Sequence, residues 1–191
     1  MNPKTIAVVA VFSALTVALV LSPAKIPAPY APFLKYQIWE IPIVTAFLLY
    51  GPLVGVSISI INTIVLLGVY PGDLPTGPLY NFTAVLSMLL GIYIMHRFAV
   101  KRFSEGRETI LTFSSTSLGI ILRVGVMSIV NWVFLRYPYP VGFSMPVEAI
   151  TAMLPVMGFF NATLALYTIP TGYFLARAIS YGTKTPRWSQ S

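Results

Sequence analysis

Six apolar segments, separated by short polar or proline-rich connections, dominate the sequence. They do not alternate apolar and polar residues as membrane-barrel strands do, and a helix needs about 20 residues to cross the hydrocarbon. The pattern therefore predicts six transmembrane helices near residues 5–22, 38–51, 53–70, 79–97, 110–134 and 149–178. The second segment is short and turns into the third at Gly51-Pro52, whereas the sixth is long and contains Pro155 and Pro170, which predict kinks.

Composition agrees with this pattern. The 191 residues are 57% hydrophobic and 9% charged, whereas soluble domains are about 45–50% apolar and about 25% charged. A chain of this size cannot hide so much apolar surface from water. We therefore expect an all-α, multi-pass protein of the cell membrane, with its six helices in a compact bundle and residues 1–191 forming a single transmembrane domain.

The basic residues predict an orientation. With the N-terminus in the cytoplasm, eight of the twelve lysines and arginines fall on the inner side and three on the outer side. The inner set is Lys4, Arg97, Lys101, Arg102, Arg107, Arg177, Lys184 and Arg187, and the outer set is Lys25, Lys35 and Arg136. Because basic residues concentrate in cytoplasmic loops, both termini are predicted to be cytoplasmic. The net charge of +7 then has a membrane explanation and does not call for a nucleic-acid partner.

The chain has few groups that could carry out catalysis or hold a metal. It has no cysteine, one histidine and five carboxylates, and their spacing suggests neither a metal site nor an acid/base pair. No GxSxG motif and no phosphate-binding loop is present. We therefore expect no catalytic residues, no metal, no cofactor and no ATP hydrolysis by this chain.

Polar residues inside the apolar segments are the remaining candidates, since they are costly in lipid and often functional. They are Asn62, Asn81, Arg123, Asn131 and Asn161. A lone asparagine in a membrane helix can instead hydrogen-bond neighbouring helices, and Asn62 fits that role best. Arg123, deep in its span, either faces the bundle interior with a partner or reaches toward the interface.

The outer connections, residues 23–37, 69–81 and 136–146, are rich in proline, glycine and tyrosine. Their aromatic residues fit an interfacial belt, but three stiff loops on one face could also cover a pocket. On the first helix Ala10, Ala14 and Ala18 recur every four residues. Such a stripe allows close helix approach, either inside the bundle or with a partner helix.

Several stretches together resemble the substrate-binding S components of energy-coupling factor (ECF) transporters, and among them most the riboflavin-specific members. The stretches are Phe33-Leu34-Lys35, Glu40-Ile41-Pro42, Gly51-Pro52-Leu53-Val54-Gly55, GPLYNF (77–82), VNWVFLRYPY (130–139) and MLPVMGFFNATLALYTIPTGYFLAR (153–177). The resemblance touches all six predicted spans. It implies an S component that binds riboflavin on the outer side and delivers it with a T component and two ATPases.

The resemblance also implies roles for individual residues. Riboflavin would be the transported ligand, contacted by Asn131 and Asn161 and covered by the first outer loop. The full set of implied substrate-binding residues is Phe33, Leu34, Tyr80, Asn81, Arg123, Asn131 and Asn161. The Ala10/Ala14/Ala18 face matches the family's docking face for the T component. Lys35 and Glu40 are expected to anchor the first loop at the interface.

One departure keeps other ligands open. Riboflavin members commonly carry a lysine three residues after the asparagine of the sixth helix, and here that residue is Leu164. Either Arg123 compensates or the ligand differs, in which case another vitamin or a queuosine precursor is the alternative. A small intramembrane enzyme or a structural membrane subunit is the alternative from a different class.

Overall fold

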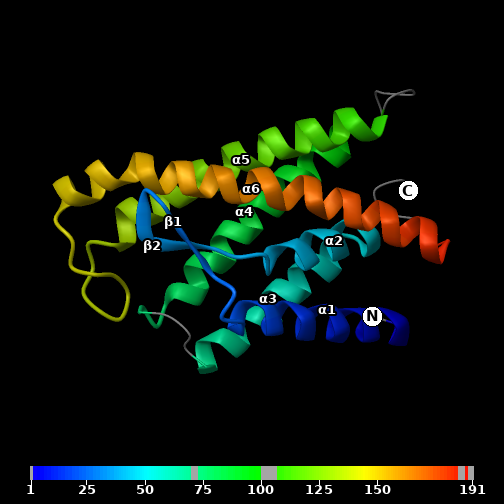
Figure 1. Ribbon diagram of the computed structural model, residues 1–191, viewed down its shortest axis with the longest axis horizontal. Coiled ribbons are helices and arrows are strands. Elements are labelled where there is room, and N and C mark those ends of the chain that lie inside the picture. The colour runs from blue at the N-terminus through cyan, green and yellow to red at the C-terminus, as the bar shows by residue number, and fades with distance from the viewer. Residues whose placement is uncertain (1, 70–72, 100–106, 185–187, 189–191) are drawn as a thin grey trace.

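The computed structural model describes residues 2–69, 73–99, 107–184 and 188. Within them the chain forms six helices and one two-stranded β-hairpin (Figure 1). The elements are α1 (Pro3–Leu21), β1 (Ile26–Ala28), β2 (Ala31–Tyr36), α2 (Glu40–Tyr50), α3 (Pro52–Val69), α4 (Gly77–Ala99), α5 (Arg107–Phe134) and α6 (Val147–Thr183). The six predicted segments thus match six observed helices, although part of the predicted inner loop, residues 100–106, lies outside the described residues.

Five of the helices are long and apolar enough to cross a membrane, and α2 is the exception. Many side chains on the outer faces of these helices are apolar and exposed, for example Val11, Ile64, Phe113 and Phe174, which are 63–77% exposed. Large apolar surfaces of this kind require lipid. The chain is therefore a multi-pass membrane protein, as its sequence predicts.

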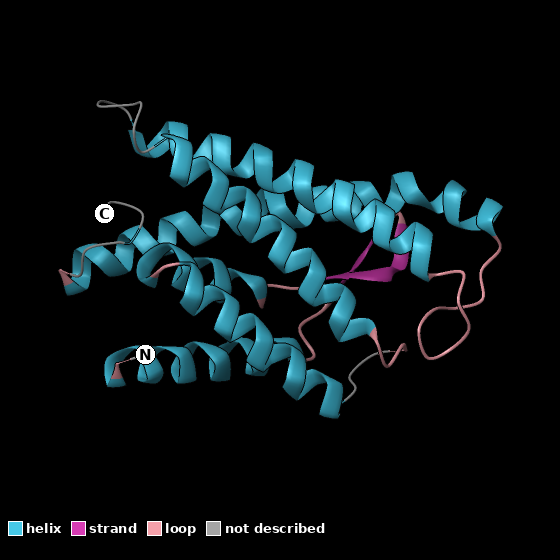
Figure 2. Cartoon of the chain, turned by 180° about the vertical axis from the view of Figure 1, so that it is seen from behind, coloured by secondary structure: helices cyan, strands magenta, loops and turns pink. Residues whose placement is uncertain are grey.

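The two ends of the bundle carry different elements. Both termini lie at one end, and the β-hairpin and the α5–α6 connection lie toward the other, as two opposite views agree (Figures 1 and 2). This arrangement fits an even number of crossings. The cytoplasmic orientation of the termini remains a prediction from the basic residues. We refer below to the terminal end and the hairpin end of the molecule.

Helix α2 forms the centre of the core. It has 11 residues, nine of them buried, and at 1.5 Å per residue its length is about 16 Å, or half of the hydrocarbon thickness. A helix that is apolar all round is usually buried on every side, and α2 indeed contacts α1, α3, α4 and α6. The second predicted segment is therefore a short helix, as expected, but α2 is too short to cross the hydrocarbon by itself.

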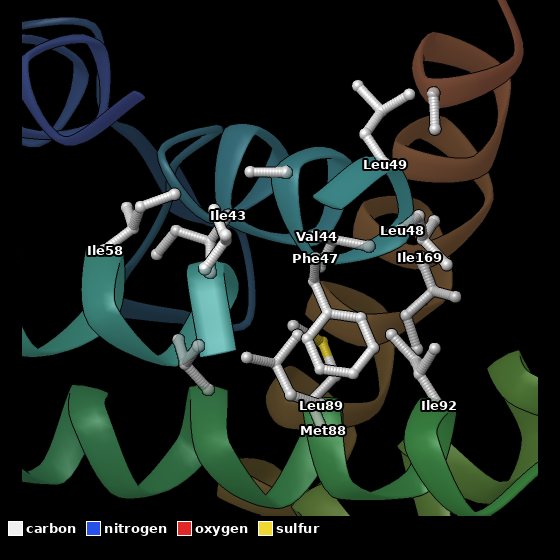
Figure 3. Close-up of a cluster of buried hydrophobic side chains, with 14 of the residues drawn as sticks. Ile43, Val44, Phe47, Leu48, Leu49, Ile58, Met88, Leu89, Ile92 and Ile169 are labelled. Carbon is white, nitrogen blue, oxygen red and sulfur yellow. The ribbon is translucent and has the colours of Figure 1, made fainter. Parts of the chain in front are cut away.

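The core packs the side chains of α2 against three other helices (Figure 3). Phe47 points toward Met88 and Leu89 of α4, and Ile169 of α6 lies beside Leu48. These side chains are at most 2% exposed. In lipid these contacts stabilise the bundle through close van der Waals packing, because the lipid tails are as apolar as the side chains.

Glycines allow the closest approaches. Gly51, at the end of α2, has φ +98°, a backbone conformation that glycine adopts without strain, and Pro52 then begins α3. A Cβ atom on Gly91 of α4 would lie 2.7 Å from the Cα of Gly119 of α5. The tight α2–α3 turn predicted at Gly51-Pro52 is therefore observed, and the close α4–α5 contact depends on the absence of a side chain at Gly91.

Candidate ligand-binding site

A cavity of about 190 Å³ lies at the hairpin end of the bundle. It is bounded by β2 and the start of α2, the first turns of α4, the last turns of α5 and the first half of α6. The lining residues are Leu34, Lys35, Gln37, Trp39, Glu40, Tyr80, Asn81, Ala84, Arg123, Met127, Asn131, Leu135, Met157, Phe160, Asn161 and Leu164. Apolar walls with a few polar groups are typical of small-molecule sites.

The structure brings together six of the seven residues that the sequence suggests for substrate binding. Leu34, Tyr80, Asn81, Arg123, Asn131 and Asn161 all line the cavity. Phe33 does not: it is 59% exposed, because alternation along β2 turns it away from the side on which Leu34 and Tyr36 pack against α6. Phe33 is therefore not part of the cavity lining, and its contact with a ligand stays a prediction.

Arg123 forms the floor of the cavity together with Glu40. Its Nη2 donates to Glu40 Oε1 at 2.8 Å, and its Nη1 donates to the other carboxylate oxygen. Both side chains are almost fully buried, at 3% and 4% exposure. Of the two alternatives for Arg123, the structure shows the interior one with a partner. The expected role of Glu40 as an interfacial anchor is wrong, because Glu40 lies inside the bundle.

The position of Glu40 also suits its charge. It is the first residue of α2, and the N-terminus of a helix carries a partial positive charge that stabilises a carboxylate. Glu40 is thus stabilised from two sides, by a helix end and by a guanidinium. The Arg123 head in turn donates from Nε to Asn161 Oδ1 at 3.0 Å and lies 3.6 Å from Met88 Sδ.

Two polar side chains at the cavity keep hydrogen-bonding capacity. Asn131 is 8% exposed and lines the cavity, and its amide makes no hydrogen bond within the described part of the chain. Gln37 Oε1 is buried and has no partner among the described residues. Gln37 was missed from the sequence, because no local pattern distinguishes it from an interfacial residue.

The hairpin covers the cavity by packing on α6. The Tyr30 and Tyr36 hydroxyls are 2.6 Å apart, and Tyr36 is hydrogen-bonded to Thr163 of α6 at 2.8 Å. The Tyr167 hydroxyl donates to the Gln37 carbonyl. Burial first, and then the Tyr36 hydroxyl, raise the pKa of Tyr30 above its ordinary value. The proline-rich first loop is therefore a folded cover and not a linker.

The α5–α6 connection is fixed to the start of α4. Thr76 Oγ1 donates to the Pro140 carbonyl at 2.8 Å, and the Tyr80 hydroxyl donates to the Val141 carbonyl at 2.9 Å. The Tyr80 hydroxyl is thus used to hold this loop. In those parts that the structure describes, the connections at the hairpin end are folded and fixed to the helices around the cavity.

The remaining predicted residues lie elsewhere. Ala10, Ala14 and Ala18 are exposed, because α1 faces the bundle through Val9, Ser13, Thr16 and Val20. The stripe therefore does not pack inside the described chain.

Asn62 is 2% exposed, but its Oδ1 has no partner in the described residues, so the expected interhelical hydrogen bond is not observed there. Within the described residues, no cluster of three or more His, Asp or Glu side chains could hold a metal.

Comparison with solved structures places this fold in a known class of membrane protein. The chain superposes on a structure described as "Structure and mechanism of the S component of a bacterial ECF transporter", with a TM-score of 0.74 and 22% identity, covering 96% of this chain and 99% of the other. The chain therefore has the fold of an ECF transporter S component.

Sequence comparison gives particular relatives. Riboflavin transporter RibU of Staphylococcus aureus (strain TCH60) is 27% identical over 130 residues, which are 68% of this chain and 65% of that protein. Riboflavin transporter FmnP of Bacillus subtilis (strain 168) is 29% identical over 143 residues, or 73% of this chain and 70% of that protein. The match thus spans about two thirds of each relative. No family model matches the sequence.

These findings confirm the resemblance stated from the sequence, to S components with riboflavin-specific relatives. The proteins that this chain resembles are transporters or transporter components. The comparisons therefore group the chain with transport proteins and not with enzymes, as the sequence predicts.

Proposed function

We propose that the chain is the S component of an ECF-type importer and that residues 1–191 act as one domain that binds riboflavin on the outer side of the membrane. The cavity at the hairpin end carries this proposal, since it combines apolar walls with amide groups that have spare hydrogen-bonding capacity. The names of the two relatives support riboflavin as the ligand.

The chemistry of the cavity suits a flavin. Phe160, Met127 and Leu164 line it with apolar surface, which a flat aromatic ring system requires. Asn131 and Gln37 offer donors and acceptors for ring carbonyls, ring nitrogens or the ribityl hydroxyls. We propose these two, with Asn161 and Asn81, as the polar contacts. Leu164 stands where riboflavin-specific S components commonly have a lysine. Arg123 cannot take the place of that lysine as a free cation, because Glu40 neutralises the Arg123 charge.

The cavity volume indicates how the ligand would enter. Small-molecule pockets are usually ~300–1,000 Å³, and the cavity here has a volume of about 190 Å³. We propose that the hairpin moves outward to admit the ligand, since its contacts with α6 are a few hydroxyl bonds and ring contacts such as that between Tyr36 and Phe160, with centroids 4.9 Å apart.

The test of this function is a titration of the purified protein with riboflavin, followed by quenching of the flavin fluorescence. We expect saturable quenching, and a yellow preparation where the vitamin co-purifies. Absence of quenching by the unaltered protein would overturn the riboflavin assignment. Mass spectrometry of small molecules released on denaturation would then identify another vitamin or a queuosine precursor.

The orientation has its own test. The hairpin lies at the end away from both termini (Figure 2), and residues of β2 line the cavity, so cytoplasmic termini would place the cavity on the outer side. A reporter fused after Ser191 should behave as a cytoplasmic protein. An external signal from that reporter would reverse the proposed side of binding.

We propose that a T component and two ATPases complete the transporter, since the chain has no phosphate-binding loop of its own. The exposed Ala10/Ala14/Ala18 face would dock the T component, because small residues allow backbones to approach closely. Ala14→Trp should weaken the complex about tenfold or more, by a steric clash of the kind that costs 1–3 kcal/mol in packed sites. Riboflavin binding by the isolated chain should be unchanged, and the reverse result would contradict a docking role.

A further inference from the structure

Arg123 joins three helices beneath the cavity. From α5 it reaches Glu40 at the first turn of α2 and Asn161 on α6, and all three residues are at most 8% exposed. Every nitrogen of the guanidinium has a partner: Nη1 and Nη2 contact the carboxylate, Nη1 also approaches Met88 Sδ, and Nε donates to Asn161.

The bond from Nε determines how the Asn161 amide is oriented. The Nε–H group can only donate, so the atom facing it at 3.0 Å must be the amide oxygen. On its other side the amide Nδ2 donates to the Met157 carbonyl at 2.9 Å, which can only accept. The amide is thus held in one orientation at both ends. One Nδ2 hydrogen and one Oδ1 lone pair remain for a ligand.

Asn131 provides an internal contrast. It lines the same cavity and is equally buried, but its amide has no hydrogen bond to any described residue. Its amide can therefore turn to suit a ligand, whereas the Asn161 amide cannot.

We infer that Arg123 is a positioning residue, held in place by Glu40, that presents the Asn161 amide to the ligand in a fixed orientation and does not itself supply a charge to the ligand. This inference rests on the proposed function for the identity of the ligand. It assigns the buried pair a role in selecting the ligand, because a fixed amide accepts only one arrangement of donors and acceptors, and pre-organised groups bind with less loss of freedom.

The test is a double-mutant cycle on riboflavin affinity. Arg123→Lys keeps a cation beside Glu40 but lacks the planar fork that bonds Glu40 and Asn161 together. We expect Arg123→Lys to weaken binding about tenfold, comparable to the loss of one buried hydrogen bond. In the Asn161→Ala background the same change should alter affinity by less than about twofold, because coupled residues are not additive.

A second cycle with Asn131→Ala is the matched control, and there the two effects should multiply. Equal losses from Arg123→Lys in the presence and absence of Asn161 would overturn the inference, since Arg123 would then act on the ligand directly or only through stability. If Arg123→Lys fails to fold, Glu40→Met with Arg123→Met removes both charges and enters the same cycle with Asn161→Ala, and additivity there would overturn the inference equally.

A measurement without ligand separates this inference from the proposed function. Nuclear magnetic relaxation of ¹⁵N-labelled side-chain amides reports how rigidly each amide is held. The Asn161 amide, assigned by its loss in Asn161→Ala, should be more ordered than that of Asn131 and should lose order in Arg123→Lys, while Asn62 is unaffected. An Asn161 amide as mobile as that of Asn131 would overturn the inference. Failure of the unaltered protein to quench riboflavin would refute only the ligand assignment.

Discussion

The hairpin end and the terminal end of the bundle both contain buried polar side chains, but they use them differently. At the terminal end the Tyr173 hydroxyl contacts His96 Nε2 and donates to Ser115 Oγ at 2.9 Å, joining α4, α5 and α6. At the hairpin end Asn131 and Gln37 Oε1 keep unused hydrogen-bonding groups beside a cavity.

The surroundings of the two clusters differ in the same way. The His96 ring stacks on Tyr173, with centroids 5.8 Å apart, and lies 5.8 Å from the Trp188 ring, so aromatic rings surround the cluster at the terminal end. Buried polar groups are costly when unpaired. The Tyr173 cluster pairs its polar groups across three helices, and we infer that Asn131 and Gln37 keep unused groups because a ligand completes their bonds.

The largest effect on stability is expected at the Arg123–Glu40 ion pair, which both joins helices and borders the cavity. Arg123→Ala leaves the Glu40 carboxylate buried and uncompensated, and breaking a buried pair in this way costs roughly 3–5 kcal/mol. The melting temperature should fall sharply. Lys35→Ala is the control, because the Lys35 side chain is exposed and surface charges contribute at most about 1 kcal/mol. A small change in Arg123→Ala would mean that water reaches Glu40.

The second effect should appear in affinity, and in Asn131→Ala without a loss of stability, because the Asn131 amide bonds no described residue. Asn131→Ala or Asn161→Ala leaves ligand groups unpaired away from water, which costs roughly 1–3 kcal/mol, or about tenfold to a hundredfold in riboflavin affinity. Asn62→Ala is the control, since Asn62 is buried away from the cavity lining, and it should leave affinity unchanged. Normal binding by both site variants would show that other residues hold the ligand.

The helices could be predicted from the sequence because lipid imposes one simple rule, a long apolar segment for each crossing. The five long spans follow from that rule. The short α2 and the tight turn after it follow from the Gly51-Pro52 break in the apolar sequence. Asn131 and Asn161 were candidates as polar residues inside apolar segments, the resemblance to S components implied a role for them, and the structure places both at one cavity.

Glu40 and Gln37 could not be predicted in the same way. Both lie at the start of an apolar segment, where the sequence alone favours an interfacial residue over a buried one. Their burial depends on the hairpin, whose Leu34 and Tyr36 pack on α6 residues more than 120 positions later in the chain. Such long-range contacts leave no local pattern, and the pairing of Glu40 with Arg123 across 83 residues leaves none either.

The smallest effect should come from the terminal end and completes the comparison. Tyr173→Phe keeps the ring that stacks on His96 but removes the hydroxyl that contacts His96 Nε2 and Ser115 Oγ. Loss of such a hydroxyl among buried polar groups costs about 1–3 kcal/mol, less than the loss of Arg123. The melting temperature should therefore fall moderately. Riboflavin affinity should stay within about twofold, because sites without shared partners act independently.

The matched control is Tyr181→Phe, which changes an exposed tyrosine on the same helix and should change neither property. A selective loss of affinity in Tyr173→Phe, without a change in melting, would show that the two ends are coupled and that the Tyr173 cluster affects ligand binding.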